Sequence, residues 1–345
     1  MKRRSQWFAM LAVLGIAVWL GWRQYERYWV NEPIAALHEP VTLEVAPGAS
    51  LAAVARDLEN RGLMERTGAW VRLAKRTGDA TRIQAGEYRI IPGTSPATLL
   101  AQLVAGDVVL HSVTLLEGWS FRQGLAAIQA HPQVKAELRG LRDAELMARL
   151  GVSDGRPEGQ FFPDTYRFPR GTSDRELLRQ AYARMQRELQ AVWSRRAKNL
   201  PLDSPYDALI LASLVEKETG AADERPLIAG VFVNRLRMGM RLQTDPTVIY
   251  GLGEKFDGNL RRRDLLNDTP YNTYLRAGLP PTPIALPGSA ALAAAVQPST
   301  TDALYFVATG RGDGRHFFAT SLVAHNANVS RHLSNLRGGS GVQVR

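Results

Sequence analysis

The chain has 345 residues, of which 45% are hydrophobic, and a net charge of +10 with a pI of about 10.1. This length and apolar content suit two folded domains and exclude a largely disordered chain. Cysteine is absent, which excludes disulfides, thiolate metal sites and cysteine nucleophiles. The positive charge favours a membrane surface or an acidic polymer as partner. Because no recognition helix or aromatic-stacking motif accompanies it, we expect no nucleic-acid partner.

The N-terminal segment is strongly apolar. Residues 7–22 (WFAMLAVLGIAVWLGW) carry no charge, residues 2–4 before them are Lys-Arg-Arg, and Arg23 follows them. An apolar run with tryptophans at its ends and a basic cluster before it is typical of a membrane-spanning anchor whose N-terminus stays in the cytoplasm. A cleaved signal peptide is the alternative, but the small-residue cleavage site that it requires is missing. We therefore expect an anchor over residues 1–24.

A polar stem at 25–40 leads into a repeated strand–turn–helix pattern. The first unit predicts a strand at 41–45 and a helix over 51–63, and the second unit occupies 86–104. In each unit a Pro-Gly-x-Ser turn places a serine at the helix N-cap, where its oxygen accepts from a free backbone N–H. The pattern predicts a small α+β module over 41–112. It resembles a LysM module, a type that binds N-acetylglucosamine polymers; an ordinary α+β domain with capped helices is the alternative.

The remainder, 113–337, is predicted to be one larger and mostly helical domain. A hairpin is expected near its end, with its turn in the glycine-rich segment 310–314. The Arg-Gly-Asp tripeptide in that turn is interpreted as hairpin loop and not as an adhesion motif. Residues 338–345 are predicted to be a disordered tail. The fold class is therefore α+β, with helices at 143–151, 174–198, 205–219, 224–238, 288–297 and 321–336.

The helix predicted over 205–219 carries two glutamates in different surroundings. At about 100° per residue, Glu218 falls within the apolar stripe, whereas Glu216 falls on the opposite side and is expected to be solvated. Burial and the nearby helix C-terminus both raise the pKa of a carboxyl group, as a general acid at neutral pH requires. The alternative is that Glu218 forms a salt bridge with a buried arginine, such as Arg225 or Arg235.

Three polar and aromatic stretches follow this helix, at 242–251, 271–274 and 278–283. They offer hydroxyl groups, amides and ring faces, as sugar-binding clefts do. Tight structural loops are the alternative, since prolines recur in them. The candidate substrate-binding residues in these stretches are Gln243, Thr244, Asp245, Tyr271, Asn272 and Thr273.

Several of these stretches together resemble one known family. The motifs that carry the resemblance are EGQFFPDTY at 158–166, LVEKET at 214–219, NRL at 234–236, GMRLQTDPTVIYG at 239–251, YNTY at 271–274 and GLPP at 278–281. With these motifs the chain resembles the MltG (YceG-like) endolytic murein transglycosylases, and the resemblance extends over the whole chain.

The resemblance implies an enzyme of the peptidoglycan layer with Glu218 as its catalytic acid/base. It implies cleavage within glycan strands, at the β-1,4 bond between N-acetylmuramic acid and N-acetylglucosamine, with a 1,6-anhydromuramic end. Tyr271 and Asn272 are similar to an element that lines the cleft of soluble lytic transglycosylases. The implied location is the inner membrane, crossed once, with the catalytic domain in the periplasm. The implied partners are glycan strands and membrane-bound peptidoglycan synthases.

Two other functions are compatible with the residues. A hydrolytic muramidase would use Glu218 with Asp245, because ordinary glycosidases need two carboxyl groups. A non-catalytic glycan-binding scaffold would use only the LysM-like module. We expect no cofactor and no metal, because the six histidines are dispersed and form no His-x-x-x-His pattern. His325 and His332 lie two turns apart on one predicted helix, and the sequence gives them no further role.

Overall fold

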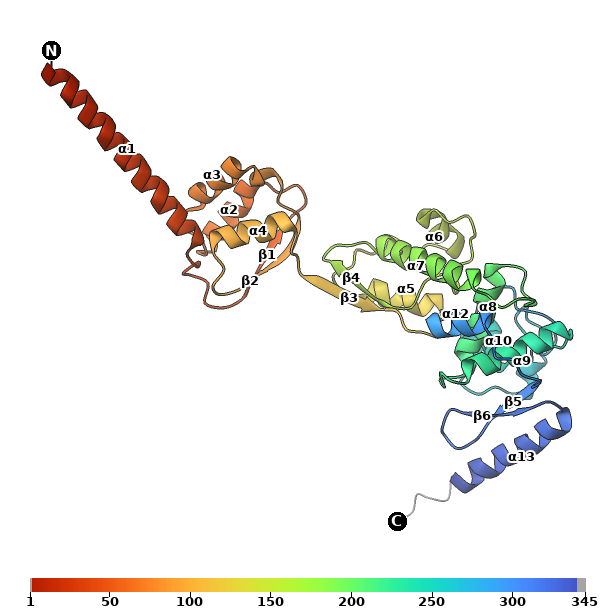
Figure 1. Cartoon of the computed structure of the whole chain (residues 1–345). Helices are drawn as coiled ribbons and strands as arrows, with labels where there is room; N and C mark the ends of the chain where they lie inside the picture. Colours follow the sequence, from red (N-terminus) through yellow and green to blue (C-terminus); the bar gives the residue numbers. More distant parts are fainter. Residues whose placement is uncertain (1, 340–345) are drawn as a thin grey trace. The chain divides into compact units, whose positions relative to one another are not determined.

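The computed structural model describes residues 2–339 and divides the chain into two compact units (Figure 1). The first contains Met1–His111 and Arg167–Gly171, and the second contains Ser112–Tyr166 and Thr172–Arg345. The strands β3 (Leu110–Thr114) and β4 (Thr165–Pro169) pair with each other where the chain passes between the units. The fold is mixed α+β, as predicted.

The first unit packs three helices on a two-stranded sheet. Strand β1 (Val41–Val45) pairs antiparallel with β2 (Gly86–Ile90), with Leu43 opposite Tyr88. The predicted serine caps are present: Ser50 accepts from a backbone N–H of α2 (Leu51–Asn60), and Ser95 does the same for α4 (Pro96–Ala105). Helix α3 (Thr67–Thr77) and the short turn η1 (Asp79–Thr81) were not predicted. The core of the unit includes the fully buried side chains Leu43, Leu58, Trp70, Tyr88, Ile90, Leu99 and Leu103.

Helix α1 is one continuous helix over Lys2–Asn31, which extends well into the predicted stem. After its C-terminal end, the chain joins the core of the first unit: Ile34 and Leu37 are buried there, and the Ile34 N–H donates to the Thr94 carbonyl at 2.9 Å. Among residues 2–339, no helix reaches the combined length and apolarity needed to span a bilayer. The predicted membrane-spanning anchor is therefore not supported.

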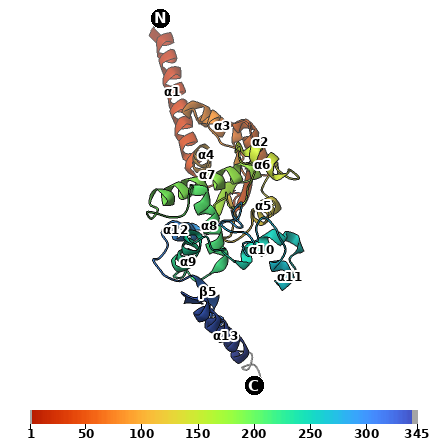
Figure 2. The same cartoon turned by 90° about the vertical axis from the view of Figure 1, so that its right-hand side faces the viewer.

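The second unit is mostly helical. Its core surrounds α8, which contacts α7, α9, α10 and α12 (Figure 2). The predicted hairpin is present as an antiparallel β5–β6 pair, and helix α13 packs against it. Apart from β3 and β4, the elements of this unit are α5 (Phe121–Ala130), α6 (Asp143–Leu150), α7 (Asp174–Ser194), α8 (Pro205–Glu218), α9 (Arg225–Arg237), α10 (Asp245–Leu252), η2 (Gly253–Lys255), α11 (Arg262–Leu265), α12 (Ser289–Val296), β5 (Tyr305–Ala308), β6 (His316–Ala319) and α13 (Leu322–Gly339).

Helix α8 is buried on all sides. Every side chain from Ala208 to Val215 is buried, and Ser204 and Asp207 form a capping box at its start. Ser213, on the side of the helix opposite the apolar stripe, is also fully buried and accepts a hydrogen bond from the Ile284 N–H at 3.0 Å. The loop before α12 covers that face, and its position could not be inferred from the periodicity of α8 itself.

The predicted tail begins at residue 338, but α13 continues to Gly339. The rest of that tail, residues 340–345, lies outside the described residues.

Candidate active site

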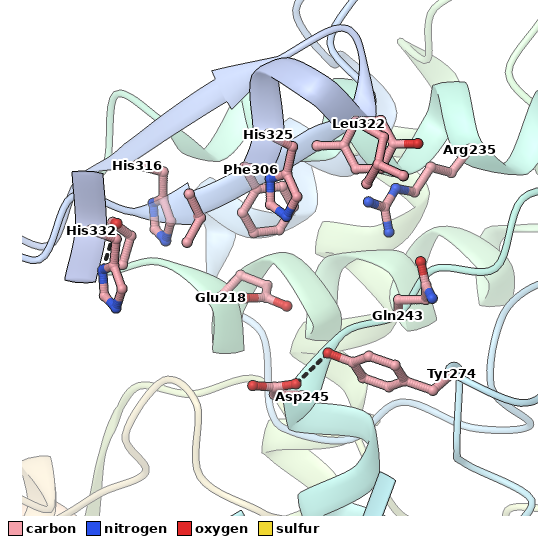
Figure 3. Close-up of a pocket in the computed structure, with 13 residues that line it drawn as sticks. Glu218, Arg235, Gln243, Asp245, Tyr274, Phe306, His316, Leu322, His325 and His332 are labelled. Carbon is pink, nitrogen blue, oxygen red and sulfur yellow. Dashed lines mark hydrogen bonds between the residues drawn. The ribbon is translucent and has the colours of Figure 1, made fainter. Parts of the chain in front are cut away.

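Glu218 is the last residue of α8 and opens onto a pocket of about 540 Å³. After it the chain leaves the helix, because Thr219 is extended. Figure 3 shows the Glu218 carboxyl group between one wall that carries Asp245 and Tyr274 and another that carries Phe306 and His325. A carboxyl group at the end of a buried helix is thus placed at a cavity that a ligand can enter.

The surroundings of Glu218 favour its protonated form near neutral pH. Burial is the largest effect and raises the pKa of Glu218 to about 7, with a further increase from the charge of Asp245. The Thr244 hydroxyl donates to the Glu218 carboxyl group, and this bond, together with the charge of Arg235, opposes the increase. Within residues 2–339 Glu218 forms no salt bridge, and Arg225 pairs with Glu216 instead. The raised pKa therefore supports the interpretation of Glu218 as a general acid. The alternative, a salt bridge between Glu218 and a buried arginine, is not found among these residues.

Glu216, two residues earlier, has a structural place. Its side chain is only 6% exposed, accepts from the Gly288 N–H at 3.0 Å and lies 3.7 Å from the guanidinium group of Arg225. The prediction that Glu216 is solvated is wrong, because the segment before α12 and Arg225 at the start of α9 enclose it. Its carboxyl group ties three segments together and does not line the pocket of Glu218.

Three predicted substrate-binding residues lie at the pocket. Gln243 and Asp245 line it, and Thr244 between them contacts Glu218 directly. Gln243 adopts a left-handed backbone conformation (φ 49°), which turns the chain just before α10. Asp245 begins α10 and accepts from the Tyr274 hydroxyl at 2.5 Å.

The other three predicted residues make contacts within and between these loops. Thr273 accepts from the Thr244 N–H at 3.1 Å, and the Asn272 amide group donates to the carbonyls of Leu265 and Asn267. Tyr271 packs edge-on against Tyr250, with ring centroids 4.8 Å apart. None of the three lines the pocket among the described residues. Their direct contact with substrate stays a prediction.

Sequence reasoning missed much of the pocket wall. The missed side chains are Arg235, Tyr274 and the residues of the C-terminal segment, by which we mean β5, β6 and α13. Tyr274 belongs to the YNTY motif and could have been included on that ground. The two-turn spacing of His325 and His332 was the only signal for α13. The C-terminal segment contributes Tyr305, Phe306, Val307, Ala308, His316, Leu322, His325 and His332.

A second carboxyl group with a raised pKa lies in the EGQFFPDTY motif. Burial raises the pKa of Glu158 to about 7, and its hydrogen bonds oppose the increase. It accepts from the Phe121 N–H at 2.9 Å and from the Tyr250 hydroxyl at 3.1 Å. Glu158 therefore joins the start of α5 to α10, the helix that carries Asp245.

Among residues 2–339, no group of three or more metal-binding side chains is arranged to hold an ion.

Comparison with known proteins identifies the family of this chain. The YceG-like family model matches residues 43–331. An endolytic murein transglycosylase of Bacillus subtilis (strain 168) is 31% identical over 313 residues, covering 86% of this chain and 85% of that protein. An endolytic murein transglycosylase of Streptococcus pneumoniae is 29% identical over 331 residues, covering 86% of this chain and 59% of that protein. The crystal structure of a yceG-like protein from Listeria monocytogenes superposes with a TM-score of 0.54 at 28% identity, covering 84% of this chain and 99% of that one. The chain belongs to the YceG-like family.

Proposed function

We infer that this chain is an endolytic murein transglycosylase, an enzyme that cleaves within the glycan strands of peptidoglycan. The observation that carries the inference is Glu218: a carboxyl group with a pKa of about 7, at the end of a buried helix and open to a pocket. Relatives at 29–31% identity over most of the chain bear this name.

The reaction needs one acid/base group. Protonated Glu218 gives its proton to the oxygen of the β-1,4 bond between N-acetylmuramic acid and N-acetylglucosamine, and the bond from that oxygen to C1 breaks. The C6 hydroxyl of the same muramic acid then bonds to C1 and releases its proton, which in the simplest form returns to the Glu218 carboxylate. The product has a 1,6-anhydromuramic end, and water is not consumed. Such cuts would terminate the elongation of a strand.

Asp245 supports the rival hydrolytic reaction, because it lines the same pocket and could activate a water molecule. Mass spectrometry of fragments released from purified peptidoglycan separates the two. Fragments with anhydromuramic ends, one water lighter than hydrolysis products, support transglycosylation. Reducing muramic ends from the wild-type enzyme would support the muramidase and overturn our proposal.

The Glu218→Gln variant tests the catalytic assignment. The amide keeps the shape of the side chain but cannot donate and retake a proton, so we expect the rate of glycan cleavage to fall roughly 100-fold to 10,000-fold. An unchanged rate would favour a different acid. Strand binding without cleavage by the wild-type protein would favour the non-catalytic scaffold.

We also propose that α1 attaches the enzyme to the inner membrane, with the catalytic unit in the periplasm. In support, large apolar side chains within residues 7–22 are exposed, including Trp7, Leu11, Trp19 and Trp22, and a basic cluster precedes them. The strand–turn–helix unit at β1 and α2 supports glycan binding by the LysM-like module. Membrane-bound peptidoglycan synthases are proposed partners, since they act on the same strands at the same surface.

A further inference from the structure

The mechanism above uses none of the groups that the C-terminal segment brings to the pocket. One of them, His316 at the start of β6, lies at the same pocket as Glu218 and above its side chain in Figure 3. The side chain of His316 is only 10% exposed. A buried imidazole beside a catalytic carboxyl group needs an explanation.

Glu224 and two phenylalanine rings fix the orientation of the His316 ring. Its Nδ1 lies 2.8 Å from a carboxyl oxygen of Glu224, and the backbone N–H of His316 donates to the other oxygen at 3.2 Å. The ring also packs edge-on against Phe306 at 5.5 Å and against Phe318 at 6.4 Å. Since Glu224 is itself only 9% exposed, this pair is built into the structure and is not a mobile surface contact.

The Glu224 carboxylate determines which ring nitrogen carries the proton. A carboxylate only accepts hydrogen bonds, so Nδ1 of His316 carries the hydrogen and donates it. In the neutral ring Nε2 is then the acceptor. Within residues 2–339 Nε2 has no hydrogen-bond partner, and it is not among the enclosed side-chain atoms that lack one. His316 therefore presents a free acceptor that a ligand in the pocket can reach.

We propose that His316, held by Glu224, is a second proton acceptor of the active site. This rests on the proposed transglycosylase function and divides its two proton transfers between two residues. Glu218 gives its proton to the leaving oxygen as the bond from that oxygen to C1 breaks. As the C6 oxygen bonds to C1, its proton passes to Nε2 of His316. The imidazolium then loses that proton to solvent, and the Glu218 carboxylate regains one from solvent, so the cycle closes without net consumption of water.

A purely structural role for the pair is the alternative. Glu224 is the N-cap residue of α9, and the neighbouring Arg315 bridges to Asp223 at 2.8 Å, so these contacts also fasten the hairpin to α9. A fastening contact changes stability, whereas a proton acceptor changes which nucleophile reaches C1. The product distribution therefore distinguishes the two roles, because only the second predicts that water competes with the C6 hydroxyl once the acceptor is removed.

The experiment compares products and rates for the full chain and three variants on purified glycan strands. For His316→Gln we expect cleavage at least about 10-fold slower and a clear rise in reducing muramic ends. Glu224→Gln should act in the same direction, because an amide N–H facing Nδ1 favours the tautomer whose Nε2 carries the hydrogen. Asp223→Asn removes the ion pair with Arg315 but leaves the 3.8 Å contact between Arg315 and Glu224 and every group of the pocket, so its products should stay anhydromuramic.

Each outcome decides the proposal. If His316→Gln is folded and gives only anhydromuramic ends at a rate within about twofold of wild type, the proposal is wrong. If His316→Gln does not fold, Glu224→Gln decides by the same criterion. If Asp223→Asn alters the product ratio as much as the other two, the pair is a fastening contact only. Failure of the underlying function is seen separately, because the wild-type chain would then release no anhydromuramic ends.

Discussion

In the proposed reaction the carboxyl group of Glu218 must be protonated when substrate binds, so its pKa should limit the rate on the alkaline side. With a pKa of about 7, kcat/KM should fall as pH rises through 7. The Thr244 hydroxyl stabilises the carboxylate form. Thr244→Val removes that bond, favours the protonated form and should move the alkaline limb of the pH–rate profile upward by roughly half a unit to one unit.

Thr247→Val is the matched control for this measurement. Thr247 is also buried and donates to the Thr244 carbonyl at 2.7 Å, but it does not touch Glu218. Its loss should lower stability and leave the alkaline limb in place. A limb that moves downward in Thr244→Val, or moves equally in both variants, would contradict the role given to the hydroxyl.

The two glutamates near the end of α8 should respond in opposite ways to the same substitution. Glu216→Gln weakens a nearly buried ion pair with Arg225, so we expect the thermal midpoint to fall, while the activity of the folded protein stays within a few-fold of wild type. Glu218→Gln should lose activity without a fall in its thermal midpoint, because it removes a buried carboxyl group that is costly to ionise. Differential scanning calorimetry with an activity assay on the same samples tests both, and loss of activity in a stable Glu216→Gln protein would count against the assignment.

Residue periodicity could find Glu218 but could not place Glu216. The helical wheel of α8 has one strongly apolar stripe, and Glu218 lies in it, so its burial was predictable. Glu216 is buried by Gly288, which lies 72 residues away, and by Arg225 at the start of the next helix, and the periodicity of α8 reveals neither contact. The same limit explains the pocket wall, because the C-terminal segment reaches Glu218 only through tertiary packing.

Among the elements, α5 and α10 are joined by a buried carboxyl group whose charge is costly. The pKa of Glu158 is raised to about 7, so the folded state holds the proton more tightly than the unfolded state does. The resulting penalty is absent below about pH 4.5, grows as pH rises to 7 and is complete above it. Glu158→Gln keeps an acceptor for the Phe121 N–H and an amide group facing Tyr250, but it cannot ionise.

We therefore expect Glu158→Gln to be about as stable as wild type at pH 4.5 and more stable at pH 8, by an amount on the order of 3 kcal/mol. Urea denaturation of both proteins at the two pH values measures this. A difference that does not depend on pH would show that the carboxyl group is not buried in its neutral form. A lower activity in the more stable variant would indicate that Glu158 also positions α10 for catalysis.

Elements with local signals were predictable, and those with tertiary or ambiguous signals were not. The serine caps, the hairpin and the long helices follow from N-cap chemistry, turn glycines and apolar periodicity. No helix was predicted over α10, and tight loops were left as an alternative there because prolines recur, yet a proline in the first turn is common at the start of a helix. Helix α3 carries Thr67, Trp70 and Ala74 on one buried face, a spacing that was present in the sequence but overlooked.

In the whole molecule, α1 combines two parts with different surroundings. Its N-terminal half exposes large apolar side chains, whereas the chain just beyond its C-terminal end packs into the first unit through Ile34 and Leu37. A protein that starts at residue 24 loses the first part and keeps the second. We therefore expect residues 24–345 to fold, to cleave isolated glycan strands within a few-fold of the full chain, and to lose most of its binding to lipid vesicles.

Sedimentation with vesicles at low and high salt separates the apolar helix from the net charge of +10. Charge-driven binding to anionic vesicles weakens with salt because the Debye length falls from about 10 Å at 0.1 M to about 3 Å at 1 M. Binding through α1 persists at high salt and does not need anionic lipid. If the shortened protein binds as strongly as the full chain at high salt, α1 is not the attachment. If it unfolds, the N-terminal half of α1 stabilises the first unit, and its exposed apolar side chains serve the fold and not a membrane.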